Sequence, residues 1–401
     1  MKSDSGAKKR IKVLRIKSRL TIGGPDIHVL LLNSGLDKES FESYLAVGAT
    51  DSGEPDMTHV ANELGINLFV IPELKRKIDL KNDIIALVKL CRLMRRIRPD
   101  IVHTHTAKAG TLGRIAAIIT GVPIKVHTYH GHIFHSYFSR SATRLFIFIE
   151  RLLARFTDRI VVISKNQLRD VKDVYRIAPA EKCPLIPLGL DLEPFLDETR
   201  RGGGLLGPEG LLRVGIVGRL VDVKNHKMFL DALKWIKDRE PGMKVEFLVV
   251  GGGGLMEGLE SYARELGVED SVVFKGFLPE LAGDRGELAS IYKGLDVVAL
   301  TSLNEGTPIS LIEAMASAKA VVSTDVGGVR DVVVQDETGL LSPSSDIDGF
   351  TSNLITLLKD RDRRDEMGRK GRAFVRERFS KERLFKDIEA LYRELYDKDD
   401  N

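Results

Sequence analysis

The chain has 401 residues, of which 43% are apolar and 29% are charged, a composition typical of folded globular proteins. Because a chain of this length exceeds what one hydrophobic core usually supports, we expect two domains. No segment approaches the ~20 apolar residues that a membrane-spanning helix needs, and the basic start of the chain continues into charged sequence rather than into the apolar region of a secretory signal. Two widely separated cysteines argue against a disulfide framework or a zinc site and favour a cytoplasmic location.

Charge is distributed unevenly along the chain. Residues 1–195 carry 31 Lys and Arg against 20 Asp and Glu, whereas residues 196–401 carry 30 against 37. A basic first half suits nucleic acid, anionic lipid or a phosphorylated substrate. The first half contains no nucleic-acid-binding module and no aromatic stacking pattern, so nucleic acid is not an expected partner and the other two interpretations are favoured.

Short β-branched segments alternate with helical patterns from one end of the chain to the other. The expected strands lie at 11–16, 43–48, 67–71, 100–105, 123–130, 159–164, 212–218, 244–252, 271–276, 296–302 and 320–325. This βαβ repetition predicts an α/β fold with parallel sheets covered by helices on both faces. Ligands of such sheets bind beyond the carboxyl ends of the strands, so two such lobes imply a cleft between them.

A glycine-rich turn follows the first expected strand. The backbone of Gly23 and Gly24 lacks side chains there and would allow a phosphate to approach closely. The turn matches neither the dinucleotide-binding pattern nor the P-loop pattern. It is therefore a candidate ligand contact without evidence for either class.

Histidines cluster in the first half of the chain, at His103, His105, His127, His130, His132 and His135. Strand alternation puts His103 and His105 on the same face. No carboxylate or cysteine spacing supports a metal site, so no metal is expected. Neutral imidazole both donates and accepts hydrogen bonds, and we favour contacts with sugar hydroxyls in a cleft.

Residues 139–159 have the pattern of an amphipathic basic helix. Arg140, Arg144, Arg151 and Arg155 fall on one stripe about 60° wide at ~100° per residue, beside bulky apolar residues. This combination suits peripheral contact with an anionic membrane. The alternative is a helix that buries its apolar residues in the core and exposes its arginines to solvent.

The βαβ pattern is interrupted at 196–212, where Gly, Pro and charged residues precede a new strand. We therefore expect a first α/β lobe at 1–195, a linker at 196–212 and a second lobe at 213–379. Residues 380–401 read as an amphipathic C-terminal helix that could pack back on the first lobe.

Two cations follow the first strand of the second lobe, where Arg219 and Lys224 lie five residues apart after a glycine turn. Charge-assisted contacts from two such side chains would neutralise a departing diphosphate without a metal. The alternative is a solvated basic loop.

The later glycine run is a poor dinucleotide fingerprint, because reading Gly251 and Gly253 as its first two glycines puts Met256 at the third.

A strand, a loop and a helix start follow one another at 296–316. The expected strand ends near Ser302, Thr307 is the expected N-cap, and Pro308 occupies the first helical position. The amides of Ile309 and Ser310 would then lack partners at the positive end of the helix, which suits a diphosphate.

Two glutamates flank this helix start. Glu313 lies three residues after Ser310, roughly 4.5 Å along the axis, within reach of a ribose attached to a bound diphosphate. Glu305 lies in the preceding loop and would face the sugar hydroxyls at the other end of the donor. The alternative is an ordinary capped helix with two exposed glutamates.

Together these motifs resemble the retaining GT-B glycosyltransferases of family four over nearly the whole chain. The matching features are the GGP turn at 23–25, T-x-H at 128–130, GLD at 189–191, GR…K at 218–224 and E-x7-E at 305–313. The segment 127–139 resembles the subgroup that builds bacterial capsule, O-antigen and exopolysaccharide repeats. Two positions depart from the family pattern: Leu188 stands where Asn usually precedes GLD, and Asp331 stands in GGVRD at 327–331, where Glu is common.

The resemblance implies two Rossmann-like lobes, acceptor-side at 1–195 and nucleotide-sugar-binding at 213–379, facing a central cleft. It implies donor contacts from Gly23, Gly24, Arg219, Lys224, Glu305, Gly306, Thr307, Ile309, Ser310 and Glu313. It makes Arg219 and Lys224 the diphosphate clamp, and counts both with His130 and Glu305 as catalytic. Acceptor-side contacts are expected from His105 and His132.

The implied reaction moves a hexose or N-acetylhexosamine from a UDP- or GDP-sugar to an acceptor hydroxyl with retention at the anomeric carbon. The expected acceptor is a glycan or a polyprenyl-diphosphate-linked sugar at the inner face of the cell membrane. No cofactor and no divalent metal are expected, because the cations and the helix amides would stabilise the leaving diphosphate. The alternatives are a UDP-sugar epimerase of the same architecture and a catalytically silent scaffold in a sugar-assembly complex.

Overall fold

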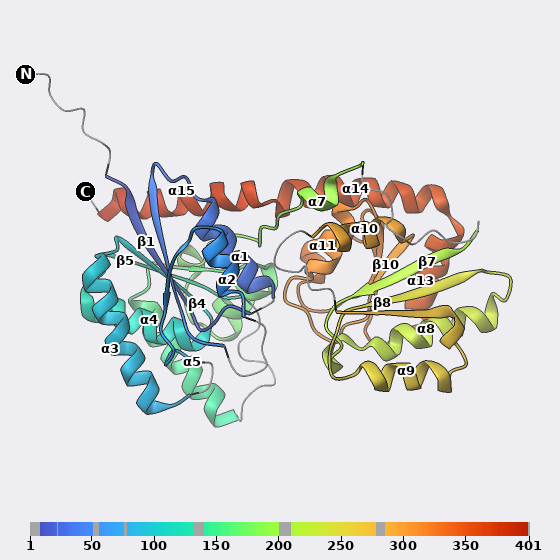
Figure 1. The fold of residues 1–401 in the computed structure, drawn as a ribbon, viewed down its shortest axis with the longest axis horizontal. Coiled ribbons are helices and arrows are strands. Elements are labelled where there is room, and N and C mark those ends of the chain that lie inside the picture. The colour runs from blue at the N-terminus through green and yellow to red at the C-terminus, as the bar shows by residue number, and fades with distance from the viewer. Residues whose placement is uncertain are drawn as a thin grey trace, which may run out of the picture. The chain divides into compact units, whose positions relative to one another are not determined.

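The computed structural model describes residues 9–21, 23–50, 56–75, 78–130, 140–199, 210–277 and 285–399, without the side chains of residues 140–142. The chain divides into two compact units, one formed by Met1–Leu190 with Lys381–Asn401 and the other by Asp191–Ser380. Each unit contains a six-stranded parallel sheet flanked by helices, which confirms the predicted α/β class (Figure 1).

The first unit contains all six strands expected there: β1 (Ile11–Lys17), β2 (Phe41–Val47), β3 (Asn67–Val70), β4 (Ile101–His105), β5 (Ile124–Thr128) and β6 (Arg159–Val161). Their order in the sheet is β3-β2-β1-β4-β5-β6. The helices are α1 (Gly24–Gly35), α2 (Thr58–Glu63), α3 (Leu80–Ile97), α4 (Ala107–Thr120), α5 (Arg140–Arg155), α6 (Lys165–Arg169) and α15 (Lys381–Asp399).

Alternation along β1 supplies both faces of this sheet. Leu14 and Ile16 pack with α3 and α4 on one face, whereas Ile11 and Val13 pack with α1 and α15 on the other (Figure 1). Such alternation is what a strand between two helical layers requires. The C-terminal helix α15 is therefore part of the first unit's core.

The second unit is built in the same way from β7 (Leu212–Val217), β8 (Val245–Val250), β9 (Val272–Gly276), β10 (Val297–Leu300), β11 (Ala320–Thr324) and β12 (Gly339–Ser342), in the order β12-β11-β10-β7-β8-β9. Its helices are α7 (Glu193–Leu196), α8 (His226–Arg239), α9 (Met256–Glu265), α10 (Gly286–Gly294), α11 (Ile309–Ala316), α12 (Val329–Val332), α13 (Ile347–Lys359) and α14 (Arg361–Phe379). The sequence interpretation did not include β12.

The expected linker at 196–212 lies partly outside the described residues, which omit 200–209. Before that gap, α7 belongs to the second unit, where Phe195 packs edge-to-face on Tyr292 with ring centroids 5.8 Å apart. After the gap, β7 begins at Leu212.

Each sheet has one point at which the strand order reverses, between β1 and β4 in the first unit and between β7 and β10 in the second. In open parallel sheets the loops that leave such a pair of strands diverge and create a binding site. Gly23 and Gly24 follow β1, His105 ends β4, and the candidate residues of the second unit follow β7 and β10, whereas His130 follows the neighbouring strand β5. Within the described parts of the chain, no helix combines the length and apolar composition that crossing a bilayer requires.

Candidate active site

In the second unit, the loops that follow β7 and β10 are tied together by hydrogen bonds. The Thr301 hydroxyl donates to the carbonyl oxygens of Lys224, at 3.1 Å, and Asn225, at 3.0 Å. The amide of Leu303 donates to the carbonyl of Val223 at 2.8 Å. These bonds place the loop that contains Lys224 beside the loop that contains Glu305, at the switch point of the sheet.

The side chains of Lys224 and Glu305 meet at this point. Lys224 Nζ lies 2.5 Å from Glu305 Oε1, and the Ser302 hydroxyl donates to the same oxygen at 2.6 Å. The Glu305 carbonyl oxygen accepts from the amide of Gly328 at 3.1 Å. A Cβ on Gly327, whose φ is +54°, would lie 1.9 Å from the same oxygen. Glycine at 327 is therefore required for the loop to approach Glu305.

The other predicted clamp residue, Arg219, directly follows the Gly218 turn. Its side chain is exposed and forms no ion pair with any side chain in the described part of the chain. The structure thus brings Lys224 and Glu305 together and leaves the guanidinium of Arg219 accessible to an anion.

The predicted start of the helix after β10 is wrong by one residue. Pro308, with φ −76° and ψ 95°, is extended and serves as the N-cap, and Thr307 is not the cap. The carbonyl of Pro308 accepts from the amide of Leu311 at 3.2 Å. Ile309 and Ser310 are consequently the first two helical residues, whose amides have no acceptor within a helix. Gly306 and Thr307 lie half-buried in the loop before them.

Glu313 lies on the buried side of α11 and is only 2% exposed. Arg285 Nη2 donates to its Oε1 at 2.5 Å, and the Tyr292 hydroxyl donates to its Oε2 at 3.1 Å. Burial and the Glu313 carboxylate raise the pKa of Tyr292 well above its usual value. The Arg285 guanidinium also stacks over Phe195, 5.0 Å from the ring centroid.

Neither Arg285 nor Tyr292 was singled out in the sequence, because neither belongs to a spacing motif.

The glycine run after β8 has a packing role. A Cβ on Gly251 would lie 1.9 Å from the carbonyl oxygen of Gly218, and one on Gly253 would lie 2.4 Å from that of Leu220. Close approach of two backbones accounts for these glycines.

In the first unit, the glycine-rich turn after β1 is shaped by a buried ion pair. Lys17 Nζ lies 2.6 Å from Asp26 Oδ1, which also accepts from the amide of Thr21 at 3.0 Å. Gly23 is the N-cap of α1 and has an extended backbone, with φ 174°, that any residue can adopt. A Cβ there would meet only Asp26 and Pro25, at 3.5 and 4.0 Å. The fold itself therefore does not require glycine at 23.

Four histidines gather at the carboxyl ends of β4 and β5 and on α1. His105 Nδ1 lies 2.9 Å from His130 Nε2, and the ring centroid of His28 lies 5.0 Å from that of His130. The rings of His103 and His105 are 4.4 Å apart, as expected for residues on one strand face. His132 and His135 fall outside the described residues.

Burial is the largest cause of the lowered pKa values in this cluster. It brings the pKa of His28 to about 3 and those of His103, His105 and His130 well below the usual value. The rings are therefore neutral near pH 7. Within the described ranges, no group of three or more His, Cys, Asp or Glu side chains has an arrangement that would hold a metal ion.

A buried hydrogen-bond network connects the cluster to the C-terminal helix. His103 Nδ1 lies 2.6 Å from the Tyr392 hydroxyl, and its Nε2 lies 2.7 Å from the Thr128 hydroxyl. Arg15, fully buried on β1, donates to the Tyr392 hydroxyl at 3.3 Å and to Asn33 at 3.3 Å. The network connects the carboxyl ends of β4 and β5 to α15 and β1 and thereby fixes their positions.

Comparison with known proteins gives matches along both units. The family model described as Glycosyltransferase Family 4 matches residues 22–194, and that described as Glycosyl transferases group 1 matches residues 205–374. The chain is 32% identical over 302 residues to the UDP-Gal:alpha-D-GlcNAc-diphosphoundecaprenol alpha-1,3-galactosyltransferase of Escherichia coli, covering 74% of this chain and 76% of that protein.

Two further matches extend the comparison. The capsular polysaccharide biosynthesis glycosyltransferase CapM of Staphylococcus aureus is 27% identical over 334 residues, which span 80% of this chain and 84% of CapM. Among solved structures, Anabaena Alr3699/HepE in complex with UDP superposes with a TM-score of 0.79 at 19% identity, covering 96% of this chain and 100% of that one. At this identity the superposition establishes a shared fold.

Proposed function

The chain belongs to the family 4 glycosyltransferases with the GT-B fold, and from that premise we propose that it transfers a hexose or N-acetylhexosamine from a UDP- or GDP-sugar to an acceptor hydroxyl with retention. The observation that carries the proposal is the convergence of Lys224, Glu305 and the start of α11 at the switch point of the second sheet. A cation and a helix start can bind the diphosphate of a nucleotide sugar, and the neighbouring carboxylate can bind hydroxyls of its sugar.

The diphosphate is bound by Arg219, Lys224 and the amides of Ile309 and Ser310. An ammonium has three protons, so Lys224 can donate to Glu305 and to a phosphate oxygen at once. The cations and the helix end stabilise the charge that develops on the leaving group, which is the role that a metal ion plays in other enzymes. We therefore propose catalysis without a divalent metal.

The sugar and the ribose are recognised by the two glutamates. Glu305, held by Lys224 and Ser302, accepts from sugar hydroxyls. Glu313 already accepts from Arg285 and Tyr292, but each carboxylate oxygen has a second lone pair available to a ribose hydroxyl. In the first unit we propose that Gly23 and Gly24 contact the donor.

The bond changes follow a same-face route. The bond between C1 of the sugar and the diphosphate oxygen breaks, the acceptor oxygen bonds to C1 on the same face, and the acceptor proton passes to the departing diphosphate. We assign no carboxylate the role of a covalent nucleophile; Oε1 of Glu305 is engaged by Lys224 and by Ser302. We assign His130 a contact with the reacting sugar, and His105, which bonds to it, a place on the acceptor side together with His132.

For the acceptor we propose a polyprenyl-diphosphate-linked sugar, in assembly of a cell-surface polysaccharide at the inner face of the membrane. The E. coli relative is named for a diphosphoundecaprenol-linked acceptor, and CapM for capsular polysaccharide biosynthesis. The basic first half of the chain suits a substrate that carries a diphosphate.

A thermal-shift screen against UDP- and GDP-sugars tests the donor, since a ligand at 100 times its dissociation constant adds ~2.7 kcal/mol of stability. The stabilising donor is then incubated with a synthetic lipid-diphosphate sugar, and the anomeric configuration of the product is read by NMR. Retention supports the proposal and inversion contradicts its mechanism. A new sugar isomer formed without acceptor would instead identify an epimerase.

A further inference from the structure

We propose that the helical layer formed by α3, α4 and α5 in the first unit is a docking surface for an anionic lipid bilayer. The inference goes beyond the transfer reaction, although it rests on the proposed function in one respect. A lipid-linked acceptor brings the enzyme to a membrane, whereas a free sugar acceptor would not.

The helix α5 exposes a continuous apolar stripe. The exposed fractions are 58% for Leu145, 64% for Phe148, 44% for Leu152 and 52% for Phe156, which directly follows the helix. Spacings of three and four residues keep these side chains within roughly 80° of the helix circumference. The interpretation in which the apolar residues of this helix are buried in the core holds for Leu153 and is wrong for these four.

The same layer exposes a second apolar stripe on α3, where Leu80, Ile84 and Val88 follow one another at four-residue spacing. Nine of the sixteen large apolar side chains that are exposed among the described residues lie on α3, α4 or α5 or directly after α5. On the opposite side of the sheet, α1 and α15 expose none in the described part. Exposed apolar surface is thus concentrated on one side of this unit, which is the pattern of an interaction surface.

Charge follows the same division. The helices α3, α4 and α5 contain eleven Lys and Arg against two Asp and Glu, whereas α1 and α15 contain five against seven. Both acidic residues of the basic layer are already paired, Asp83 with Lys108 and Glu150 with Arg114. Lys89 is also paired, with Glu73 outside the layer, and Arg114 is buried. The other cations leave an excess of positive charge beside the apolar side chains.

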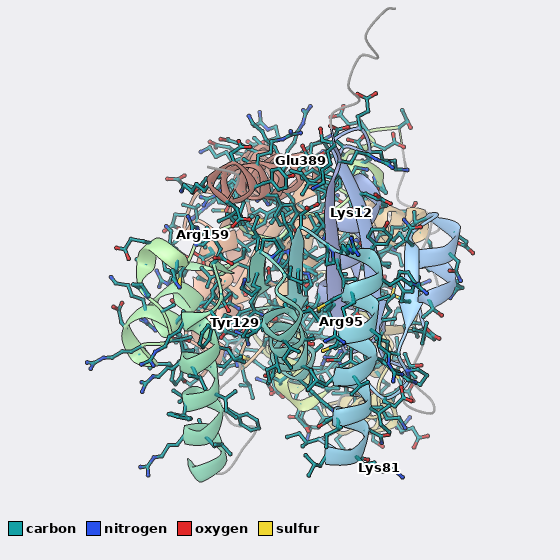
Figure 2. All side chains as sticks on the ribbon, turned by 90° about the vertical axis from the view of Figure 1, so that its left-hand side faces the viewer. Lys12, Lys81, Arg95, Tyr129, Arg159 and Glu389 are labelled. Carbon is teal, nitrogen blue, oxygen red and sulfur yellow. The ribbon has the colours of Figure 1, made fainter. Side chains whose placement is uncertain are left out.

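Individual cations border the apolar stripes. Arg144 and Arg155 on α5 are exposed and form no ion pair within the described residues. In Figure 2 the axes of α3 and α5 run roughly parallel to each other. Lys81 lies in the first turn of α3 and Arg95 in its last turn. Arg151, in contrast, donates to the carbonyl oxygen of Tyr175 at 2.7 Å, so it is partly satisfied by the protein.

These features favour a bilayer over a second copy of the chain. In a two-fold symmetric dimer the same surface faces itself, so the cations of one layer would oppose those of the other. An anionic bilayer instead offers headgroups to the cations and an apolar interior to Leu145, Phe148 and Leu152.

Co-sedimentation of the full chain with vesicles tests the proposal. We expect binding to phosphatidylglycerol–phosphatidylcholine vesicles at low salt, loss of binding at high salt, and none to pure phosphatidylcholine. The pair F148S/L152S removes apolar contacts, and R144Q/R155Q removes two cations. Each should weaken partitioning by about ten-fold or more. The matched control K386Q/K398Q removes two cations from α15 and should bind like the parent.

The proposal is overturned if the parent stays in the supernatant with anionic vesicles at low salt, or if the surface variants bind as the parent does. It is also overturned if sedimentation without lipid shows a dimer that F148S/L152S abolishes. The thermal shift produced by the stabilising nucleotide sugar shows that each variant is folded, and turnover of a water-soluble acceptor analogue is measured in parallel. Failure of membrane docking is thereby distinguished from failure of the proposed reaction.

Discussion

Lys224 and Glu305 form an ion pair with each other, with 2.5 Å between Nζ and Oε1. The sequence predicts separate tasks for these residues, one at the diphosphate and one at the sugar. In the proposed donor complex the ion pair would join these tasks, because a donor bound to Lys224 through its diphosphate would meet a carboxylate already oriented beside its sugar. Pre-oriented charges of this kind need little rearrangement during the reaction.

Substitution of either clamp residue should slow turnover. In the proposed mechanism Lys224→Ala and Arg219→Ala each remove a charge-assisted contact to a leaving group that gains charge, worth about 1.5–3 kcal/mol, or roughly ten-fold or more in kcat/KM. The matched control is Lys234→Ala on α8, a half-buried lysine that pairs with Asp238 one turn away. Parent-like turnover of both clamp variants at saturating donor would show that the clamp is misassigned.

The ion pair also predicts how two substitutions combine. Lys224→Ala leaves Glu305 without its cation, so part of its effect comes from an uncompensated carboxylate. The double variant K224A/E305Q should therefore lose less than the sum of the two single losses, with a coupling of about 0.5–3 kcal/mol. Steady-state kinetics of the four proteins provide the cycle, and strict additivity would mean that the two residues act independently.

The buried pair of Arg285 and Glu313 should support the second unit's stability. Removing one partner of a buried pair leaves an uncompensated charge, so Arg285→Gln should cost about 3–5 kcal/mol of unfolding free energy. The control Arg330→Gln removes an exposed arginine paired with Asp325 and should cost about 1 kcal/mol or less. Urea unfolding measures both, and similar losses would contradict the role of burial. Arg285→Lys, which keeps the charge, should recover part of the donor-induced thermal shift lost in Arg285→Gln.

Local sequence patterns predict most of the strands and helices, but few of the buried contacts that hold the candidate site residues in position. β-Branched segments correctly predict eleven strands, but β12 has the sequence Gly-Leu-Leu-Ser and contains no β-branched residue, so this pattern does not detect it. The pair Lys224 and Glu305 could be proposed because each residue lies next to a recognisable turn. Arg15 and Tyr392, by contrast, are 377 positions apart, and no periodicity in either segment indicates the other.

Activity should survive excess EDTA. The proposed stabilisation of the diphosphate uses Arg219, Lys224 and the amides of Ile309 and Ser310, and none of these depends on a bound cation. Turnover is compared before and after dialysis against the chelator. Loss of activity that magnesium or manganese restores would contradict the metal-free mechanism.

The buried histidines of the first unit should make its stability depend on pH. Burial lowers the pKa of His28 to about 3, and those of His103, His105 and His130 are also well below the usual value. These histidines stay neutral in the folded state and take up protons in the unfolded state. At pH values above their unfolded pKa of about 6.5 they therefore do not lower the free energy of unfolding. Below it they destabilise the fold increasingly as pH falls toward the folded pKa.

The substitution His28→Gln isolates one of these groups by its effect on the slope. Each histidine that stays neutral only in the folded state contributes about 1.4 kcal/mol of lost stability per pH unit between roughly pH 6 and 4. Urea unfolding of the parent should therefore weaken steeply across this range, and His28→Gln should reduce the slope by about that amount. Above pH 7.5 the slopes of the two proteins should coincide, whatever the substitution does to absolute stability, because His28 is then neutral in both states. An unchanged slope at acidic pH would mean that the His28 ring becomes protonated without unfolding, contrary to its full burial beside His130.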